Sequence, residues 1–250
     1  MRKESFDFYV LTMRTPERVE SIERQLSNMS IDYKLIDAVR YSKETFNDSV
    51  FIDKKIVFGR NGRALTNGEV GCFLSHKKIW EQVFLSCNAG VVFEDDAIVD
   101  KRLVGFLAQL ECSKLDYDVI LLGHSKKDHR SRKLYHFLEP LKNHIKLGDY
   151  SVGRGFKTWP SGAVGYVVTP QGAEKLLNSS IEIKSVLDDW PLFEQQGAIV
   201  KEVRPLLVWE DFINMKSSLE NDRKTPARKK IFFLARILRG LVRNAISKLG

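Results

Sequence analysis

The sequence predicts an α/β protein with a Rossmann-like mixed sheet flanked by helices and a basic amphipathic helix at the C-terminus. Apolar runs at 6–11, 91–93 and 117–123 are typical of strands, because strands buried on both faces lose the alternation of polar and apolar side chains. Segments with apolar residues at helical spacing separate these runs, as in α/β folds. With 250 residues, 43% of them hydrophobic, the chain can bury a substantial core.

The first strand is predicted at 6–11 and the first helix directly after it. Thr15 is a suitable N-cap, and Pro16 suits the first helical position. A second strand is expected at 31–39, and because a helix separates the two strands, they should run parallel. Residues 40–63 are polar and irregular, so a flexible loop over a site is expected there.

Arg14 and Arg18 flank this first strand-to-helix corner. A helix N-terminus favours anions, so the two arginines could hold a nucleotide diphosphate. As exposed residues at the start of a helix, they would need no function. The basic segment 124–133, which follows the predicted strand at 117–123, has a similar pair of interpretations: a phosphate contact or a solvated face.

A long helix is predicted from Thr66, because Thr66 and Glu69 have the spacing of a capping box. Cys72, His76 and Trp80 then share one face of that helix. A histidine on such a face is more often a core residue than a ligand, so the pattern alone assigns His76 no role.

Three adjacent carboxylates, Glu94, Asp95 and Asp96, follow the apolar run 91–93. The carboxyl ends of strands are where open α/β sheets bind ligands. Because the negative charges repel one another beside apolar residues, a cation would stabilise them. Mg²⁺ and Mn²⁺ bind such oxygen ligands together with substrate phosphates. The alternative is a solvated turn after a strand.

An aromatic stretch with glycines is a candidate for sugar binding. Gly162 lies between Trp159 and Tyr166. Aromatic rings stack on the apolar face of a sugar, and glycines leave room for it, so these residues are candidates for the acceptor site. Core aromatics with turn glycines are the alternative.

Asp188 and Asp189 form a second acidic pair among apolar residues. Partial burial raises the proton affinity of a carboxylate toward the range of a general base. An N-cap for the helix that follows is the competing interpretation.

Charge divides the chain into a body, 1–215, and a tail, 216–250. The tail holds ten Lys or Arg and two acidic residues, so its excess of eight positive charges equals the net charge of the whole chain, +8. A helix is predicted from Pro226 to Leu249, in which apolar residues from Ile231 to Val242 form a stripe with basic residues outside it. This pattern predicts a helix that lies on an anionic membrane surface, and its large apolar face argues against nucleic acid as the partner.

Cellular location can also be predicted. No apolar run reaches the roughly 18 residues that suggest a membrane span. The N-terminal residues lack the apolar stretch of a secretory signal, and the three cysteines lack metal-site spacing. A cytoplasmic protein with reduced thiols, attached peripherally to a membrane through its tail, is therefore expected.

With these segments in place, the chain resembles glycosyltransferase family 25, the bacterial lipooligosaccharide transferases, many of them β-galactosyltransferases. The resemblance runs from about residue 6 to residue 210 and rests on these stretches: Tyr9-Val10-Leu11 with Arg14 and Arg18, Gly71-Cys72-Phe73-Leu74-Ser75-His76 with Trp80, Val92-Phe93-Glu94-Asp95-Asp96, Gly165-Tyr166-Val167 with Gly172-Ala173, and Asp189-Trp190 with Phe193. The chain departs from the family after Pro205, so Trp209-Glu210-Asp211 receives no role.

The resemblance implies a GT-A-like fold, a nucleotide-sugar donor (most often UDP-galactose), a divalent cation (Mn²⁺ or Mg²⁺) and inversion at the anomeric carbon. It assigns Asp96 to the metal and Glu94 to the metal and the donor ribose. Asp95, between them, would contact either. Arg14 or Arg18 would help to stabilise the departing diphosphate.

The resemblance also assigns later positions. Asp189 matches the family's later acidic position and is the expected catalytic base, whereas Asp188 has no such match. Ser75 and His76 match motif positions without an assigned role.

The expected reaction moves a sugar onto a lipid-linked oligosaccharide acceptor of lipooligosaccharide or lipopolysaccharide, at the cytoplasmic face of the inner membrane. Two alternatives from other classes stay open. One is a metal-dependent phosphohydrolase that uses the same carboxylates on a phosphate ester. The other is a non-catalytic scaffold that docks on the membrane through the tail.

Overall fold

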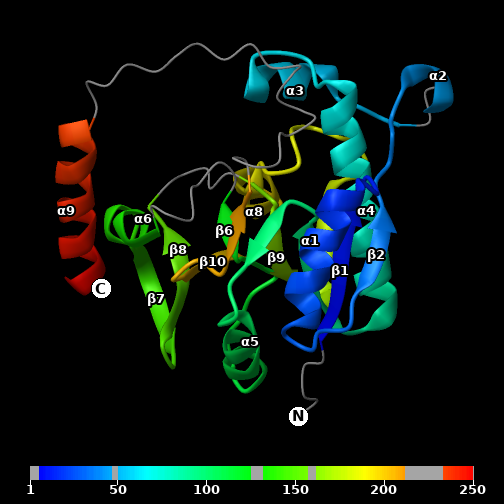
Figure 1. The fold of residues 1–250 in the computed structure, drawn as a ribbon. Helices are drawn as coiled ribbons and strands as arrows, with labels where there is room; N and C mark the ends of the chain where they lie inside the picture. Colours follow the sequence, from blue (N-terminus) through cyan, green and yellow to red (C-terminus); the bar gives the residue numbers. More distant parts are fainter. Residues whose placement is uncertain (1–5, 47–49, 125–131, 157–161, 212–232, 250) are drawn as a thin grey trace.

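The computed structural model describes residues 6–46, 50–124, 132–156, 162–211 and 233–249 (Figure 1). The larger of its two sheets consists of β1 (Phe6–Thr12), β2 (Lys34–Asp37), β3 (Ala89–Glu94), β5 (Val119–Leu121), β7 (Leu141–Leu147), β8 (Tyr150–Gly155), β9 (Gly165–Val168) and β10 (Val200–Arg204). The smaller sheet consists of β4 (Ala97–Val99), β6 (Gly123–His124) and β11 (Val208–Glu210). The helices are α1 (Pro16–Ser27), α2 (Lys43–Phe46), α3 (Lys54–Asn61), α4 (Asn67–Ser86), α5 (Leu103–Glu111), α6 (Arg132–Leu138), α7 (Pro170–Ser179), α8 (Trp190–Gln195) and α9 (Phe233–Leu249).

The larger sheet is mixed, with the strand order β2-β1-β3-β9-β5-β10-β8-β7. β1 runs parallel to β2 and to β3, which confirms the parallel start, although β2 is shorter than the strand expected at 31–39. β9 is antiparallel to both of its neighbours, β3 and β5. The predicted α/β class, a mixed sheet flanked by helices, is confirmed.

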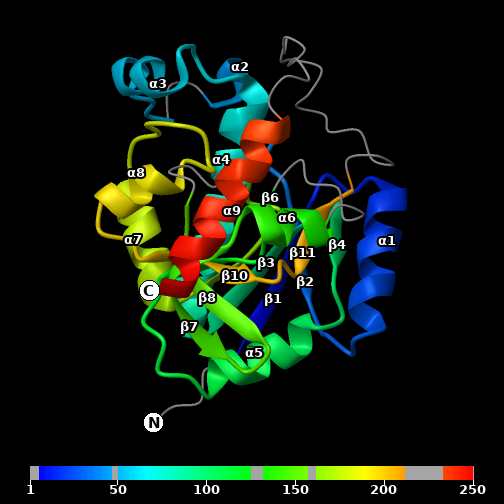
Figure 2. The same cartoon turned by 90° about the vertical axis from the view of Figure 1, so that its left-hand side faces the viewer.

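The central strands point alternate side chains to opposite faces of the sheet. Val10 and Phe93 lie in a buried cluster with residues of α1 and α5, whereas Tyr9 and Val92 lie in a second cluster with residues of α4, α7 and α8. Figure 2 shows α1 on one side of the strands and α7 and α8 on the other. Each large apolar side chain buried in this way contributes about 1.5–3 kcal/mol. Burial on both faces explains why these strands are apolar throughout.

Local capping signals mark the helix starts. Thr15 is the N-cap of α1 and Pro16 lies in its first turn, as predicted, although the Thr15 side chain makes no capping hydrogen bond. At the start of α4, Thr66 Oγ1 accepts from the Glu69 amide at 3.2 Å, and the Glu69 carboxylate accepts from the Thr66 amide at 3.0 Å. The predicted capping box is confirmed.

The expectation of an irregular loop over residues 40–63 is wrong, because α2 and α3 form there. Asp53 caps α3 by accepting a hydrogen bond from the Ile56 amide at 2.9 Å. Gly62 ends the helix in the left-handed conformation, with φ of 71°. Polar residues in this segment therefore include those that cap a short exposed helix.

The amphipathic helix predicted in the tail is observed as α9, which lies beside α6 (Figure 1). Residues 226–232 of the predicted helix lie outside the described residues. Among the described helices, none is both long enough and apolar enough to cross a bilayer.

Candidate active site

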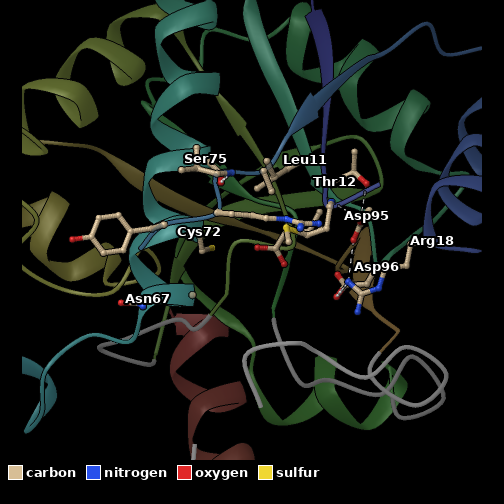
Figure 3. A pocket seen from close by; sticks show the side chains of 15 residues that line it. Leu11, Thr12, Arg18, Asn67, Cys72, Ser75, Asp95 and Asp96 are labelled. Carbon is tan, nitrogen blue, oxygen red and sulfur yellow. Dashed lines mark hydrogen bonds and ion pairs between the residues drawn. The ribbon is translucent and has the colours of Figure 1, made fainter. Parts of the chain in front are cut away.

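A cavity of about 270 Å³ opens at the carboxyl ends of β1, β2 and β3. Because these strands are parallel, their carboxyl ends meet at the edge of the sheet where α/β proteins bind ligands. Its lining comes from residues 11–13, 38–41 and 94–96, with Arg18 of α1 and Asn67, Gly68, Cys72 and Ser75 of α4 (Figure 3). The acidic turn at 94–96 thus lines a cavity, whereas the alternative interpretation placed it on a solvated turn.

Asp95 is held on both oxygens by the protein. Its Oδ2 accepts from Thr12 Oγ1 at 2.7 Å and from the Met13 amide at 3.2 Å. Its Oδ1 accepts from Arg18 Nη1 at 3.0 Å. Figure 3 shows Asp95 between Thr12 and Arg18. Asp95 therefore fixes the acidic turn to the end of β1 and to α1.

Asp96 differs from its neighbour. Its Oδ2 lies 3.4 Å from Arg18 Nη1, but its buried Oδ1 has no hydrogen-bond partner in the described part of the chain. Burial, followed by the negative charges of Glu94 and Glu210, raises the pKa of Asp96 well above its usual range. An unsatisfied buried carboxylate oxygen is costly.

Glu94 points into the same cavity, and its side chain is 26% exposed. Burial and the nearby charges of Glu210, Asp188 and Asp95 raise the pKa of this carboxyl group. The result is a cavity in which several carboxylates share one small volume. Each of them disfavours ionisation of the others.

These residues fit a divalent cation. The donor atoms are carboxylate oxygens, which Mg²⁺ and Mn²⁺ prefer, and Asp96 Oδ1 is buried without a hydrogen-bond donor. A cation held by Glu94 and Asp96 would satisfy that oxygen and would take the place of the protons that the raised pKa values favour. Glu94 and Asp96 are the residues that would hold it.

Glu210 belongs to this acidic cluster although the sequence assigned it no role. β11 pairs with β4 so that Glu210 lies opposite Ala97, one position after the acidic turn. The Asp211 amide also donates to the Asp96 carbonyl at 2.8 Å. The available signal was an acidic pair after the apolar run 206–209, the same pattern that marks residues 94–96.

Asp188 and Asp189 have different surroundings. Asp188 is half-buried and accepts a hydrogen bond from the Gly162 amide at 2.7 Å. Its negative charge is one of those that raise the pKa of Glu94. Asp189 is fully buried, and both of its oxygens accept from the Arg60 guanidinium, Oδ1 at 2.6 Å from Nη2.

Asp189 also accepts from the Leu192 amide and is the N-cap of α8, the competing interpretation of its sequence position. With no exposed surface, Asp189 cannot reach an acceptor hydroxyl in this structure. Its burial and its bonds to Arg60 and the Leu192 amide argue against the expected role of Asp189 as the catalytic base.

Ser75 connects the cavity wall to β2. Its Oγ accepts from the Val39 amide at 2.7 Å and donates to the Gly71 carbonyl at 2.6 Å. A Cβ on Gly71 would lie 2.5 Å from the Val39 carbonyl oxygen, so this contact requires glycine. The motif residues Gly71 and Ser75 therefore hold the segment after β2 against α4.

The acceptor role expected of Tyr166 is wrong, because the ring is fully buried and offers no face to a sugar. Its hydroxyl accepts from Trp80 Nε1 at 2.9 Å and lies 2.9 Å from His76 Nδ1. These are core aromatics, the alternative interpretation. Trp159 lies outside the described residues, and Gly162 contacts Asp188 as described above.

His76 is fully buried beside Tyr166, and burial lowers its pKa to about 3, so the ring is neutral. Its other nitrogen, Nε2, lies 3.5 Å from Glu94 Oε1. His76 therefore connects the aromatic core to the acidic cluster.

The basic candidates differ in their position relative to the cavity. Arg14 is half-exposed and pairs with Asp37 at 2.5 Å, whereas Arg18 lines the cavity. In the segment 124–133, His124 is buried in β6 against Glu202, at 2.9 Å, and is not a solvated phosphate contact. Residues 125–131 lie outside the described residues.

Comparison with known proteins identifies a family for this chain. Residues 6–190 match the family model of glycosyltransferase family 25 (LPS biosynthesis protein). Procollagen galactosyltransferase 1-A of Xenopus laevis is 34% identical over 197 residues, which cover 73% of this chain and 30% of the relative. Procollagen galactosyltransferase 2 of Homo sapiens is 26% identical over 189 residues, 71% of this chain and 28% of the relative.

A further human relative carries a different description. The inactive glycosyltransferase 25 family member 3 of Homo sapiens is 34% identical over 181 residues, which cover 69% of this chain and 28% of the relative. The chain thus spans less than a third of the length of these curated relatives.

Proposed function

The chain belongs to glycosyltransferase family 25, and from this premise we propose that it transfers galactose from UDP-galactose, with inversion, to a lipooligosaccharide or lipopolysaccharide acceptor. Relatives named as galactosyltransferases support the sugar, and the family's description as an LPS biosynthesis protein supports the acceptor. The cavity at the carboxyl ends of β1–β3 supports GT-A-like binding of the nucleotide sugar.

The observation that carries the proposal is the buried Oδ1 of Asp96, which has no hydrogen-bond donor among the described residues and lies within a group of carboxylates. Asp96 and Glu94 would hold Mn²⁺ or Mg²⁺ together with the diphosphate of the donor. A cation there supplies Lewis-acid stabilisation of the charge on the leaving diphosphate. Arg18 adds a positive charge at the same edge and, through Asp95, keeps the acidic turn in place.

We assign the general base to Asp188 in place of Asp189. Asp188 keeps partial exposure, is oriented by the Gly162 amide, and its charge acts on Glu94 across the site. It would take the proton from the acceptor hydroxyl while that oxygen attacks the anomeric carbon. Arg60 and Asp189 support the adjacent start of α8.

The direct test is Asp96→Asn, which preserves shape and removes the negative charge. Galactose transfer from UDP-galactose in the presence of Mn²⁺ should fall by about a hundred- to a thousandfold, the usual effect of removing one electrostatic contact to the transition state. Asp149→Asn, in the exposed turn between β7 and β8, is the matched control and should leave transfer unchanged.

Other products would identify the other classes. Release of free phosphate without a glycan acceptor would favour the phosphohydrolase. A failure to bind UDP-galactose at any metal concentration would favour a non-catalytic scaffold, and it would remove the proposal.

The second part of the proposal is attachment of α9 to the anionic cytoplasmic face of the inner membrane. On the side of α9 that faces the body, Arg243 pairs with Glu139 at 2.5 Å and Asn244 donates to the Phe137 carbonyl. Gly240 lies against Leu138 on the same side. The opposite side exposes Leu238, Leu241, Val242 and Ile246, with exposed fractions between 48% and 63%. A helix that exposes its apolar stripe in this way is suited to a lipid headgroup layer.

Liposome sedimentation tests this attachment. Leu241→Glu should reduce binding to anionic liposomes severalfold, and salt should weaken the binding of the unaltered chain. Ile181→Glu, a change at an apolar side chain that is 70% exposed outside α9, is the control. Equal binding to neutral liposomes would contradict the electrostatic part of the proposal.

A further inference from the structure

Cys72, His76 and Glu94 form a second set of ligand atoms next to the acidic turn. Cys72 and His76 lie four residues apart on α4, so they share one helical face, and Glu94 ends the strand β3 opposite them. One ligand atom from each residue lies within 4.8 Å of the other two. Cys72 and Glu94 also line the cavity, so these ligand atoms lie beside the proposed binding site of the nucleotide sugar.

His76 provides an independent observation that a ligand belongs here. The side chain is fully buried, and its Nε2 makes no hydrogen bond among the described residues, although it faces Glu94 Oε1 at 3.5 Å. Its Nδ1 lies 2.9 Å from the Tyr166 hydroxyl, which already accepts from Trp80. When Nδ1–H donates to that hydroxyl, the Nε2 lone pair points toward Glu94, the arrangement found where a histidine binds a metal.

The donor types decide which metal fits. A thiolate, an imidazole and a carboxylate are zinc ligands, whereas Mg²⁺ and Mn²⁺ favour oxygen donors. In a tetrahedral zinc site the ligand atoms lie about 3.2–3.7 Å apart, given bond lengths of about 2.0–2.3 Å. The separation of 3.5 Å between His76 and Glu94 already lies in this range. The other separations are no longer than 4.8 Å.

We propose that Cys72, His76 and Glu94 form a zinc site with its fourth position open to the cavity, and that zinc there competes with the donor-site cation for Glu94. Glu94 is common to both sets, so occupation of one site weakens the other. The competition rests on the proposed function, whereas zinc binding itself does not.

Cobalt substitution tests the site without an assay of activity. Co²⁺ added to the metal-free full chain should give a thiolate-to-cobalt absorption band that Zn²⁺ abolishes and Mg²⁺ does not. Cys72→Ser should remove the band and weaken Zn²⁺ binding by about tenfold or more. Cys112→Ser, at an exposed cysteine beyond α5, should retain both. A cobalt complex without the band, or a band lost with Cys112→Ser, would overturn the proposal.

Activity measurements then separate this inference from the proposed function. Zn²⁺ should inhibit galactose transfer by the unaltered chain, and excess Mn²⁺ should restore it. In Cys72→Ser, Zn²⁺ should inhibit much less, so that the activity with Zn²⁺ approaches the activity without it. Thermal unfolding by circular dichroism checks that the variant is folded. A thiolate band in a chain without transfer activity supports the zinc site and rejects the proposed function. Transfer without such a band rejects the zinc site alone.

Discussion

The acidic turn at 94–96 and the acidic pair at 188–189 are similar in sequence but differ in their partners in space. In the first, Asp96 has a buried oxygen without a hydrogen-bond donor in the described structure, and its pKa is raised. In the second, both carboxylate oxygens of Asp189 accept hydrogen bonds from the Arg60 guanidinium, and Asp189 is also the N-cap of α8. An acidic residue among apolar neighbours is therefore a binding candidate only when the fold leaves its charge uncompensated.

The largest expected effect separates the two members of the second pair. Asp188→Asn should lower kcat by about a hundred- to ten-thousandfold, because a general base contributes in this range, and it should leave thermal stability nearly unchanged. Asp189→Asn should instead lower stability and keep most of the kcat of the folded fraction. Steady-state kinetics combined with thermal unfolding distinguishes these outcomes. The reverse pattern would restore Asp189 as the base.

Arg60→Ala tests whether Asp189 is compensated as the structure indicates. The substitution leaves a fully buried carboxylate without its cation, and loss of one partner of a buried ion pair costs about 3 kcal/mol or more. Denaturant unfolding should show this loss. Arg14→Ala, which breaks an exposed arginine–aspartate pair, is the control and should have little effect. Similar losses in both variants would mean that burial of Asp189 has no special consequence.

A third prediction concerns pH. The pKa values of Glu94 and Asp96, raised to about 8, mean that the native state holds protons that the unfolded chain releases above about pH 4. Holding these protons stabilises the native state, and this stabilisation is fully present at low pH and is lost as the pH rises toward 8. The metal-free protein should therefore lose several kcal/mol of stability between pH 5 and pH 8.

Mn²⁺ should reverse that loss, since the ion takes the place of the protons and binds more tightly at higher pH. Differential scanning calorimetry at both pH values, with and without Mn²⁺, measures the effect. A stability that is independent of pH, or unaffected by Mn²⁺ at pH 8, would contradict the assignment of these two carboxylates.

The features that sequence reasoning predicted correctly depend on residues close together in the chain. The capping box of Thr66 and Glu69 spans three positions, and the turn at 94–96 directly follows its strand. The partner of Asp189 was not predictable in this way, because Arg60 lies 129 residues earlier. Only tertiary packing brings them together, so local pattern could not show that the carboxylate is neutralised.

The role of Tyr166 could not be predicted from neighbouring residues in the sequence either. Tyr166 is followed by two valines in a strand, and nothing near it in sequence distinguishes a stacking surface from a core ring. Its partners Trp80 and His76 come from α4, more than 80 residues away. Glu210 likewise reaches the acidic turn through the pairing of β11 with β4, two strands that are far apart in sequence.

The smallest expected effect comes from Glu210→Gln, which tests whether this distant residue belongs to the acidic turn. Glu210 is the strongest of the neighbouring charges acting on Glu94, so its neutralisation should lower the pKa values of Glu94 and Asp96. The metal-free variant should then lose less stability between pH 5 and pH 8 than the unaltered chain, by about 1 kcal/mol or less. Calorimetry over that range measures the difference, with Glu182→Gln at an exposed position as the control. An unchanged pH dependence would separate Glu210 from the cluster and leave Glu94 and Asp96 as the pair that distinguishes this turn from Asp189.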